Sequence, residues 1–132
     1  MYLVDTNVWL ERLLDQERSE EVGQFLDSIS SEQLFITDFS FHSIGVILNR
    51  LNRMEVLLDF VQDAFINGAV MLIHLDPQDT QLLTHVIDKF GLDFDDAYQY
   101  VAAEKYDLII VSFDRDFDRT ERGKRTPSQV LL

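Results

Sequence analysis

Short apolar runs alternate along the chain with longer segments in which apolar residues recur every three or four positions. The short runs cover residues 2–4, 34–37, 70–75 and 108–112, and runs of this kind are typical of buried strands in a parallel sheet. The longer segments have the spacing of amphipathic helices. This alternation predicts an α/β fold with one three-layer α/β/α domain around a parallel sheet.

Most of the predicted helices have a recognisable start or stop. Thr6 or Asn7 caps the first, and Ser19 caps the second. Asn67-Gly68 ends the fourth, and Asp76-Pro77 begins the fifth with a capping residue before a proline. The predicted helices reach from 6 or 7 to 14 and cover 19–29, 41–52, 54–65, 76–90 and 93–106, and a last helical turn starts at 126–128. Residues 130–132 are expected to pack into the body.

The composition narrows the class of protein. The chain has 132 residues, of which 46% are hydrophobic, enough for a single globular domain over residues 1–132. It has no cysteine, so a metal would be bound by carboxylate, histidine or backbone oxygen. No apolar run approaches the length of a membrane span, and no cleavage pattern follows the first run, so we expect a cytoplasmic protein without a membrane partner.

The net charge of −13 argues against a general nucleic-acid-binding protein, because such proteins present a basic surface. An enzyme that reaches phosphate groups through bound cations is compatible with this charge. The cations would invert the local electrostatic field at the site.

Three aspartates stand at equivalent places in the predicted sheet. Asp5 directly follows the strand at 2–4, Asp114 follows the strand at 108–112, and Asp96 lies in the first turn of the helix that leads into that strand. Ligands of open α/β sheets bind at the carboxyl ends of the strands. Crowded carboxylates repel one another unless a cation neutralises them, and Mg²⁺ and Mn²⁺ prefer oxygen ligands. Such ions polarise phosphoryl oxygens and make water more acidic, so the set predicts phosphodiester hydrolysis.

Each aspartate taken alone also has a structural explanation. Asp5 would cap the first helix, the aspartates of 93–96 would cap the sixth and favour its dipole, and Asp114 would shape a turn. The position that all three share at the carboxyl side of one sheet favours the metal site.

The ordered set Asp5-Thr6-Asn7-Val8, Asp96-Ala97 and Val111-Ser112-Phe113-Asp114-Arg115-Asp116-Phe117 resembles the PIN-domain family over nearly the whole chain. The resemblance implies a parallel sheet of order 3-2-1-4-5, with strands numbered along the chain, and a metal-dependent ribonuclease acting on single-stranded RNA. It implies catalytic and metal-binding roles for Asp5, Asp96 and Asp114, a share in the last role for Asp116, and supporting roles for Thr6, Asn7 and Ser112. Many members are toxins of toxin–antitoxin pairs and usually homodimers, so it also implies an antitoxin partner and a homodimer.

One position departs from the family pattern. The family usually has a glutamate early in the helix after the second strand, and here that position is Ser43. No glutamate occurs between Glu32 and Glu55. Ser43 is then expected to support the site. His42 is a candidate replacement for the missing glutamate as ligand or base, and the alternative is that it has a structural role.

The densest basic cluster follows Asp114. Its position predicts that it holds RNA phosphates beside the site. The alternative is a solvated tail in which neighbouring acids offset the charge. The cluster consists of Arg115, Arg119, Arg122, Lys124 and Arg125, and the acids are Asp116, Asp118 and Glu121.

Three other functions remain open at this point. In an aspartate-nucleophile phosphatase Asp5 would attack phosphorus, although such enzymes normally have a second aspartate two residues on, where this chain has Asn7. A receiver domain fits less well, because it needs paired acids near the first strand and a lysine after the last. A PIN-like interaction module without catalysis would explain both the missing glutamate and the acidic surface.

Overall fold

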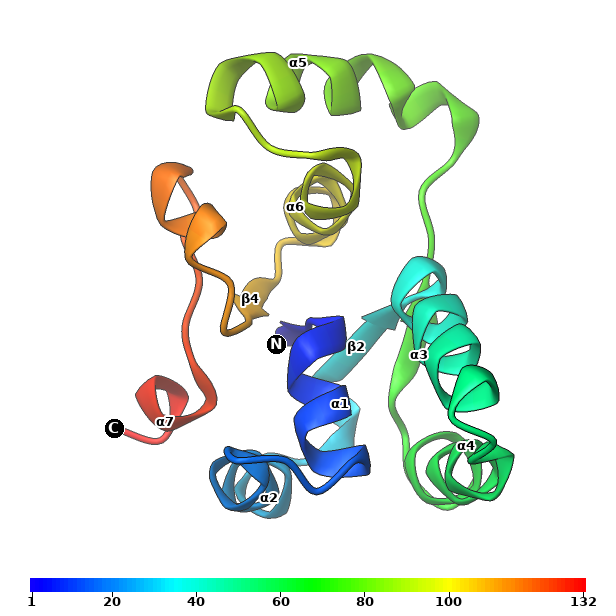
Figure 1. Cartoon of the computed structure of the whole chain (residues 1–132). Coiled ribbons are helices and arrows are strands. Elements are labelled where there is room, and N and C mark those ends of the chain that lie inside the picture. Colours follow the sequence, from blue (N-terminus) through cyan, green and yellow to red (C-terminus); the bar gives the residue numbers. More distant parts are fainter.

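A four-stranded parallel sheet forms the centre of the protein in a computed structural model that describes all residues 1–132 (Figure 1). The strand order is β3-β2-β1-β4, and β1 pairs with β2 on one side and β4 on the other. The predicted central position of the first strand is therefore confirmed. The strands are β1 (Tyr2–Val4), β2 (Leu34–Thr37), β3 (Met71–Ile73) and β4 (Ile109–Val111).

The fifth strand of the predicted order is absent, which corrects 3-2-1-4-5 to an order of four strands. Arg125 alone pairs beside β4, in an isolated parallel bridge with Val111. Its N–H donates to the carbonyl oxygen of Ile110 at 2.9 Å, and its carbonyl accepts from the N–H of Ser112 at 3.0 Å. The pairing stops there because Pro127, which has no N–H to donate, begins the last helix.

Seven α-helices surround the sheet, and several of them begin differently from the prediction. Helix α5 begins at Thr80 rather than at Asp76, because Pro77–Asp79 form a separate 3-10 turn before it. Asp5, rather than Thr6 or Asn7, caps α1, because its Oδ1 accepts from the N–H of Thr6 at 2.8 Å. Helix α3 begins at Asp38, three residues earlier than predicted, because Thr37 caps it. The helices are α1 (Thr6–Leu13), α2 (Ser19–Ser28), α3 (Asp38–Arg50), α4 (Met54–Val61), α5 (Thr80–Phe90), α6 (Phe94–Tyr106) and α7 (Pro127–Val130). Short 3-10 helices cover Ser31–Gln33, Pro77–Asp79 and Arg115–Arg119, and a π-helical segment, Gln62–Ile66, follows α4.

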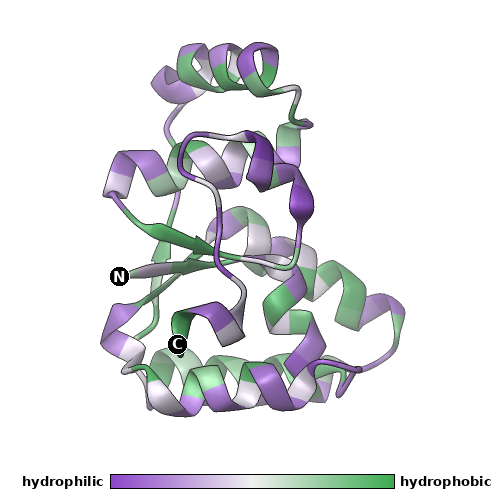
Figure 2. Ribbon diagram, turned by 90° about the vertical axis from the view of Figure 1, so that its left-hand side faces the viewer, coloured by the Kyte–Doolittle hydropathy of each residue, from purple (hydrophilic) through white to green (hydrophobic).

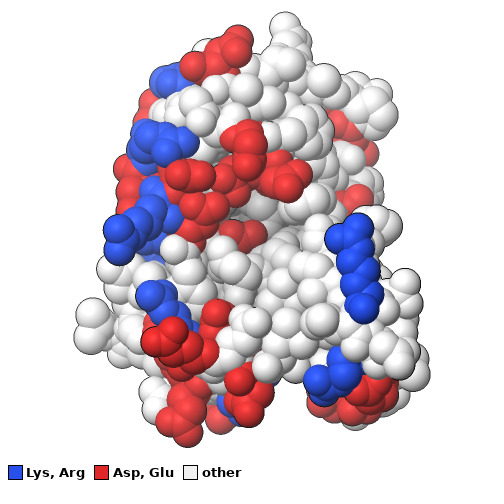
Figure 3. Space-filling view, viewed as in Figure 1, with Lys and Arg blue, Asp and Glu red and all other residues white.

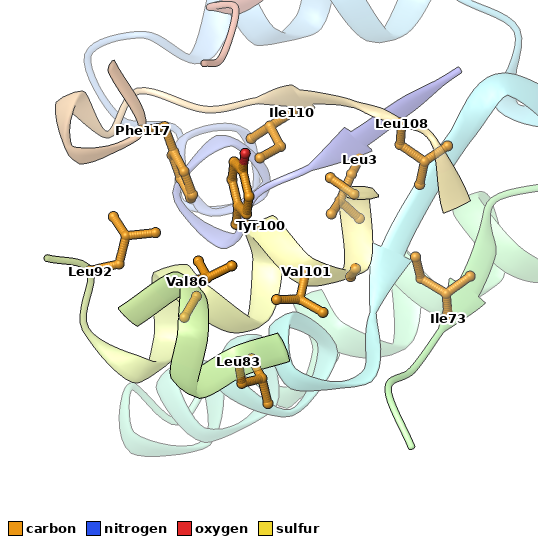
Figure 4. Packing of buried hydrophobic residues seen from close by; sticks show 13 residues of the cluster. Leu3, Ile73, Leu83, Val86, Leu92, Tyr100, Val101, Leu108, Ile110 and Phe117 are labelled. Carbon is orange, nitrogen blue, oxygen red and sulfur yellow. The ribbon is translucent and has the colours of Figure 1, made fainter. Parts of the chain in front are cut away.

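The helices form one layer on each face of the sheet, as predicted. Helices α5 and α6 lie on one side, and α1, α2, α3, α4 and α7 contribute to the other (Figure 1). Successive strand residues point to opposite faces, so Leu3 packs with α6 while Val4 packs with α1. Figure 4 shows the hydrophobic cluster between the sheet and helices α5 and α6, in which Leu3 and Ile110 of the sheet pack with Tyr100 and Val101 of α6.

The outer helices carry both apolar and polar residues, whereas the strands are apolar (Figure 2). None of the helices has the length and uninterrupted apolar character that a membrane span requires. In α7, Val130 packs against the hydrophobic cluster on the other face of the sheet, but Leu131 is 38% exposed and Leu132 fully exposed. The expectation that residues 130–132 all pack into the body is therefore wrong for the last two, which lie beyond the end of α7.

Candidate active site

Asp5 lies at the carboxyl end of β1, where its side chain is almost completely buried. Both of its carboxylate oxygens accept hydrogen bonds. Oδ1 accepts from the N–H of Thr6 at 2.8 Å and from Nε2 of Gln99 at 2.9 Å. Oδ2 accepts from Oγ of Ser112 at 2.7 Å and from Nδ2 of Asn7 at 3.4 Å. Four donors from three elements therefore fix the position of this carboxylate.

The environment of Asp5 holds its pKa above the usual value of 3.8. Burial is the largest cause, and the hydrogen bonds from Ser112, Gln99 and Thr6 oppose it by stabilising the anion. The nearby carboxylate of Asp114 raises the pKa further. All the direct partners of Asp5 are neutral groups, so a cation would relieve an otherwise uncompensated charge.

Asp96, Asp114 and Asp116 converge next to Asp5. One carboxylate oxygen of each lies within 4.8 Å of the others. Asp96 occupies the first turn of α6, where its N–H donates to Oδ1 of the capping residue Asp93 at 2.8 Å. Asp114 caps the 3-10 helix after β4, since its Oδ1 accepts from the N–H of Asp116 at 2.8 Å. Thus the local caps that sequence alone suggests exist, and the same residues also converge.

The pKa of Asp96 is raised from 3.8 to about 8. Burial is the largest cause, followed by repulsion from Asp114, Asp93 and Asp5 and by a hydrogen bond with Asp114. The cluster therefore retains a proton near neutral pH when no cation is present. A divalent cation with a preference for oxygen ligands would displace that proton, so the donor set fits Mg²⁺ or Mn²⁺.

The acids open onto a hollow of about 250 Å³. In the view of Figure 3, which matches that of Figure 1, carboxylates gather around a hollow between α1 and α6, with basic side chains along its left margin. The hollow is lined by Asp5, Thr6, Asn7, Leu10, Phe39, Ser43, Asp95, Asp96, Gln99 and Asp114.

Gln99 is the functional residue that sequence reasoning missed. Its side chain is only 1% exposed, and every polar atom of its amide is used. Nε2 donates to Asp5 and to Oγ of Ser40, both at 2.9 Å, and Oε1 accepts from Oγ1 of Thr37 at 2.7 Å. Oγ1 of Thr6 also donates to Oγ of Ser40 at 2.8 Å. The amide therefore ties α6 to the start of α3 and to the end of β1.

Replacing Gln99 by leucine should lower the free energy of unfolding by about 2–4 kcal/mol, because it removes one donor from the buried carboxylate of Asp5 and one from Oγ of Ser40, and leaves the buried hydroxyl of Thr37 without its acceptor. The matched control is Gln24→Leu at an exposed position of α2, which should change stability by less than about 0.5 kcal/mol. Urea denaturation in the presence of a chelator measures both. If Gln99→Leu is as stable as the control, the network does not hold Asp5.

The family model of the PIN domain matches residues 2–123. The chain belongs to the PIN-domain family. Members of this family are metal-dependent, and the cluster of Asp96, Asp114 and Asp116 is a nearby acidic group of the kind that such a protein needs. The sequence itself matches no curated protein.

Several solved structures have the same fold as this PIN domain. A toxin–antitoxin complex from Klebsiella pneumoniae is 18% identical, with a TM-score of 0.76 over 96% of this chain and 98% of the other. The sarcin–ricin loop cleaving toxin VapC20 of Mycobacterium tuberculosis is 15% identical, with a TM-score of 0.75 over 89% and 93%. FitAcB from Neisseria gonorrhoeae is 20% identical, with a TM-score of 0.75 over 97% and 99%. At these identities the similarity establishes the fold and nothing finer.

Ser43 stands at the position where the PIN family usually has a glutamate, and it lines the hollow with Asp5, Asp96 and Asp114. Ser43 therefore lies on the side of α3 that faces the acids, and its supporting role stays a prediction. His42, in contrast, is exposed and does not line the hollow. The structure gives no support to His42 as a replacement ligand or base.

The basic residues after Asp114 do not form one surface in this PIN domain. Arg119 pairs with Asp116 at 3.0 Å and Lys124 with Asp118 at 3.2 Å. Arg122 pairs with Asp107 at 2.9 Å and lies beside Leu108, at the opposite end of β4 from the acids. Arg115 is exposed, forms no ion pair and directly follows Asp114. RNA binding by the basic residues after Asp114 stays a prediction, and Arg115 is the one that lies nearest to Asp114 in the chain.

Proposed function

We propose that this PIN domain is a toxin-type ribonuclease that uses Mg²⁺ or Mn²⁺ to hydrolyse phosphodiester bonds in single-stranded RNA. The observation that carries the proposal is the convergence of Asp96, Asp114 and Asp116 within 4.8 Å, beside the buried Asp5. The family membership supports a nuclease, and neighbours of the same fold include a toxin that cleaves the sarcin–ricin loop.

Some residues of the site would bind the cation, and others would orient its ligands. Asp96, Asp114 and Asp116 would bind the cation, with Asp5 contributing from the floor of the hollow. Oγ of Ser112 orients two of these residues, since it donates to Asp5 at 2.7 Å and accepts from the N–H of Asp114 at 2.9 Å. The bound cation would supply Lewis acidity, which polarises a phosphoryl oxygen and acidifies the attacking water.

The proposal is tested by cleavage of an unstructured RNA oligonucleotide with Mn²⁺. Asp114→Asn should lower the rate at least about a hundredfold, because it removes a charged ligand while asparagine still caps the 3-10 helix. The control Asp88→Asn makes the same charge change at an exposed position of α5 and should cleave like wild type. A chelator should abolish cleavage in every variant.

Two results would decide against the nuclease. Equal rates for Asp114→Asn and wild type would mean that the acids are caps. A wild-type protein that cleaves no RNA and binds Mn²⁺ no better than an ordinary acidic surface would support the PIN-like interaction module instead. The phosphatase is disfavoured because both oxygens of Asp5 already accept hydrogen bonds from neutral donors, which lowers the nucleophilicity of the carboxylate.

Arg115 should contact an RNA phosphate next to the acids. Arg115→Glu is expected to weaken binding of single-stranded RNA about tenfold and to reduce the salt dependence by the equivalent of about one phosphate contact. Arg122→Glu is the matched control, because it makes the same charge change at the far end of β4. Titrations at several salt concentrations separate the two. Equal effects of both variants would assign the whole tail to non-specific electrostatics.

An antitoxin partner is also part of the proposal, because structures of the same fold include toxin–antitoxin complexes. A groove of about 530 Å³ offers it a surface between α1, α2 and α4. Trp9 and Phe60 lie in its apolar lining, the indole Nε1 of Trp9 is buried without a hydrogen-bond partner, and Asp59 and Asp63 add negative charge. An apolar segment with basic residues would suit this groove. The homodimer stays a prediction.

A further inference from the structure

Phe94 is 59% exposed, whereas the other nine phenylalanines are buried or half-buried. It is the first residue of α6 and stands two positions before Asp96. Helix formation does not require it, because phenylalanine is an average helix former. The ring therefore presents an apolar face to water directly beside the acidic site.

Phe94 is the outer end of a row of three aromatic rings. Its centroid lies 6.4 Å from that of Tyr98, and the Tyr98 centroid lies 6.0 Å from that of Phe39. The Tyr98 ring is held in place by its hydroxyl, which donates to Oδ1 of Asp38 at 2.8 Å and accepts from the N–H of Leu75 at 3.0 Å. The row thus joins α6 to α3 on a fixed central ring.

The inner end of the row reaches the acidic hollow, since Phe39 lines that hollow together with Ser43 and Asp96. Phe39 is thus shared by the hollow and the row, and the other end of the row is the exposed ring of Phe94. The acids and their cation would hold a phosphate group. A neutral aromatic surface next to a held phosphate is suited to the neighbouring base, because every nucleobase has a face that stacks on such rings.

We propose that the row Phe39–Tyr98–Phe94 is a stacking site for an unpaired nucleobase of the RNA strand whose phosphate lies at the acids. This inference rests on the proposed nuclease function and adds the place where a base of its substrate binds. A base within a duplex is already stacked on its neighbours, so the site selects loops and single strands, whose bases are free to splay out. Stacking is tolerant of base identity, so the row contributes affinity with little sequence preference.

The experiment combines a ring deletion with a base deletion. One RNA oligonucleotide is compared with copies in which a single abasic riboside replaces the nucleotide at each position flanking the cut. Phe94→Ala should lower kcat/KM about tenfold on the intact RNA. On the copy that lacks the stacked base, kcat/KM of the wild type should be lower by a similar factor. The kcat/KM of Phe94→Ala should be the same on this copy as on the intact RNA. Phe94→Trp should have the same kcat/KM as the wild type on the intact RNA and also on the abasic copy.

Control measurements separate stacking from other roles of the ring. Leu58→Ala deletes an apolar side chain that is 69% exposed on α4 and should leave all rates unchanged. Phe94→Ala should keep the wild-type melting temperature, Mn²⁺ affinity and oligomeric state. A change in oligomeric state with unaltered RNA cleavage would make the ring a protein interface and overturn the proposal.

Failure of stacking and failure of the nuclease have different signatures. If the wild type cleaves RNA and the rate of Phe94→Ala is within twofold of the wild-type rate, only the stacking proposal is wrong. A tenfold loss in Phe94→Ala that persists on every abasic copy has the same consequence, because the ring would then act without a base. If the wild type neither binds nor cleaves RNA, both proposals fall.

Discussion

Replacing Asp96 by asparagine should stabilise the metal-free protein and abolish its response to Mn²⁺. At pH 8 with a chelator, we expect the melting temperature to rise by about 4–8 °C, which corresponds to relief of about 1–2 kcal/mol of repulsion and burial cost. With Mn²⁺ the order should reverse, because wild type gains the binding free energy of the ion and the variant does not. Cleavage should fall at least about a hundredfold.

The pH dependence of stability tests independently whether the ionised Asp96 destabilises the metal-free protein. The pKa of Asp96 is raised from 3.8 to about 8, and that of Asp5 is also raised, both mainly by burial. The folded state therefore favours the protonated acids, so their contribution to stability is complete below about pH 4 and is lost as the pH rises towards 8. Metal-free wild type should lose stability over this range, and Asp96→Asn should lose less of it.

Asp88→Asn is again the control, because it removes one exposed carboxylate from the same chain. It should shift the melting temperature by no more than about 2 °C with or without Mn²⁺. Thermal scans across pH 5–8 compare the three proteins. If Asp96→Asn melts at or below the wild type in chelator at pH 8, the carboxylate is not under repulsion.

Replacing Ser43 by glutamate should tighten Mn²⁺ binding about tenfold and raise the rate of RNA cleavage. Ser43 lines the hollow with Asp5, Asp96 and Asp114, so a longer acidic side chain there would add a charged oxygen to the cluster. A neutral hydroxyl stabilises a divalent ion less than a carboxylate does. In chelator the same variant should be less stable than wild type, because the added charge increases repulsion.

Ser43→Gln is the matched control for Ser43→Glu, since it has nearly the same shape without the charge. It should leave Mn²⁺ affinity at the wild-type value. Calorimetric titration with Mn²⁺ and cleavage assays at equal RNA concentration compare the two variants. If glutamate and glutamine behave alike, the charge at position 43 does not reach the ion, and the serine is no sign of a weakened site.

Much of the site could be predicted because parallel strands present their carboxyl ends at one edge. Asp5 follows β1 and Asp114 follows β4, which are neighbours in the sheet, so their proximity follows from topology alone. Asp96 joins them because α6 begins at the same edge. The direction of Ser43 was predictable from the helical spacing of Ile44 and Leu48, which are both buried.

Gln99 could not be assigned in advance because its partners come from elements that are distant in sequence. Thr37, Ser40 and Asp5 lie 62, 59 and 94 residues away. The one available signal was a polar residue within the run Ala97, Tyr100, Val101, Ala102 and Ala103, all of which are buried. A buried amide inside an otherwise apolar helix needs partners, which was reason enough to suspect a network.

The tail after Asp114 illustrates a different limit. Alternating basic and acidic residues have no period that predicts a direction, so Arg115 and Arg122 seemed equivalent. The chain turns back after its 3-10 helix and returns along β4, which places Arg122 at the opposite edge, beside Asp107. The missing fifth strand has the same origin, since only Arg125 of this returning segment pairs with the sheet.

The central claim is that the four aspartates form one metal site, and a crystal soaked in Mn²⁺ tests it most directly. The anomalous signal of manganese should give a peak at the mouth of the hollow, within about 2.0–2.4 Å of carboxylate oxygens of Asp96 and Asp114, with Asp5 or Asp116 completing the protein ligands. The same soak of Asp96→Asn crystals should give no peak. An absent peak in wild type, or one held by surface acids away from Asp5, would contradict the account.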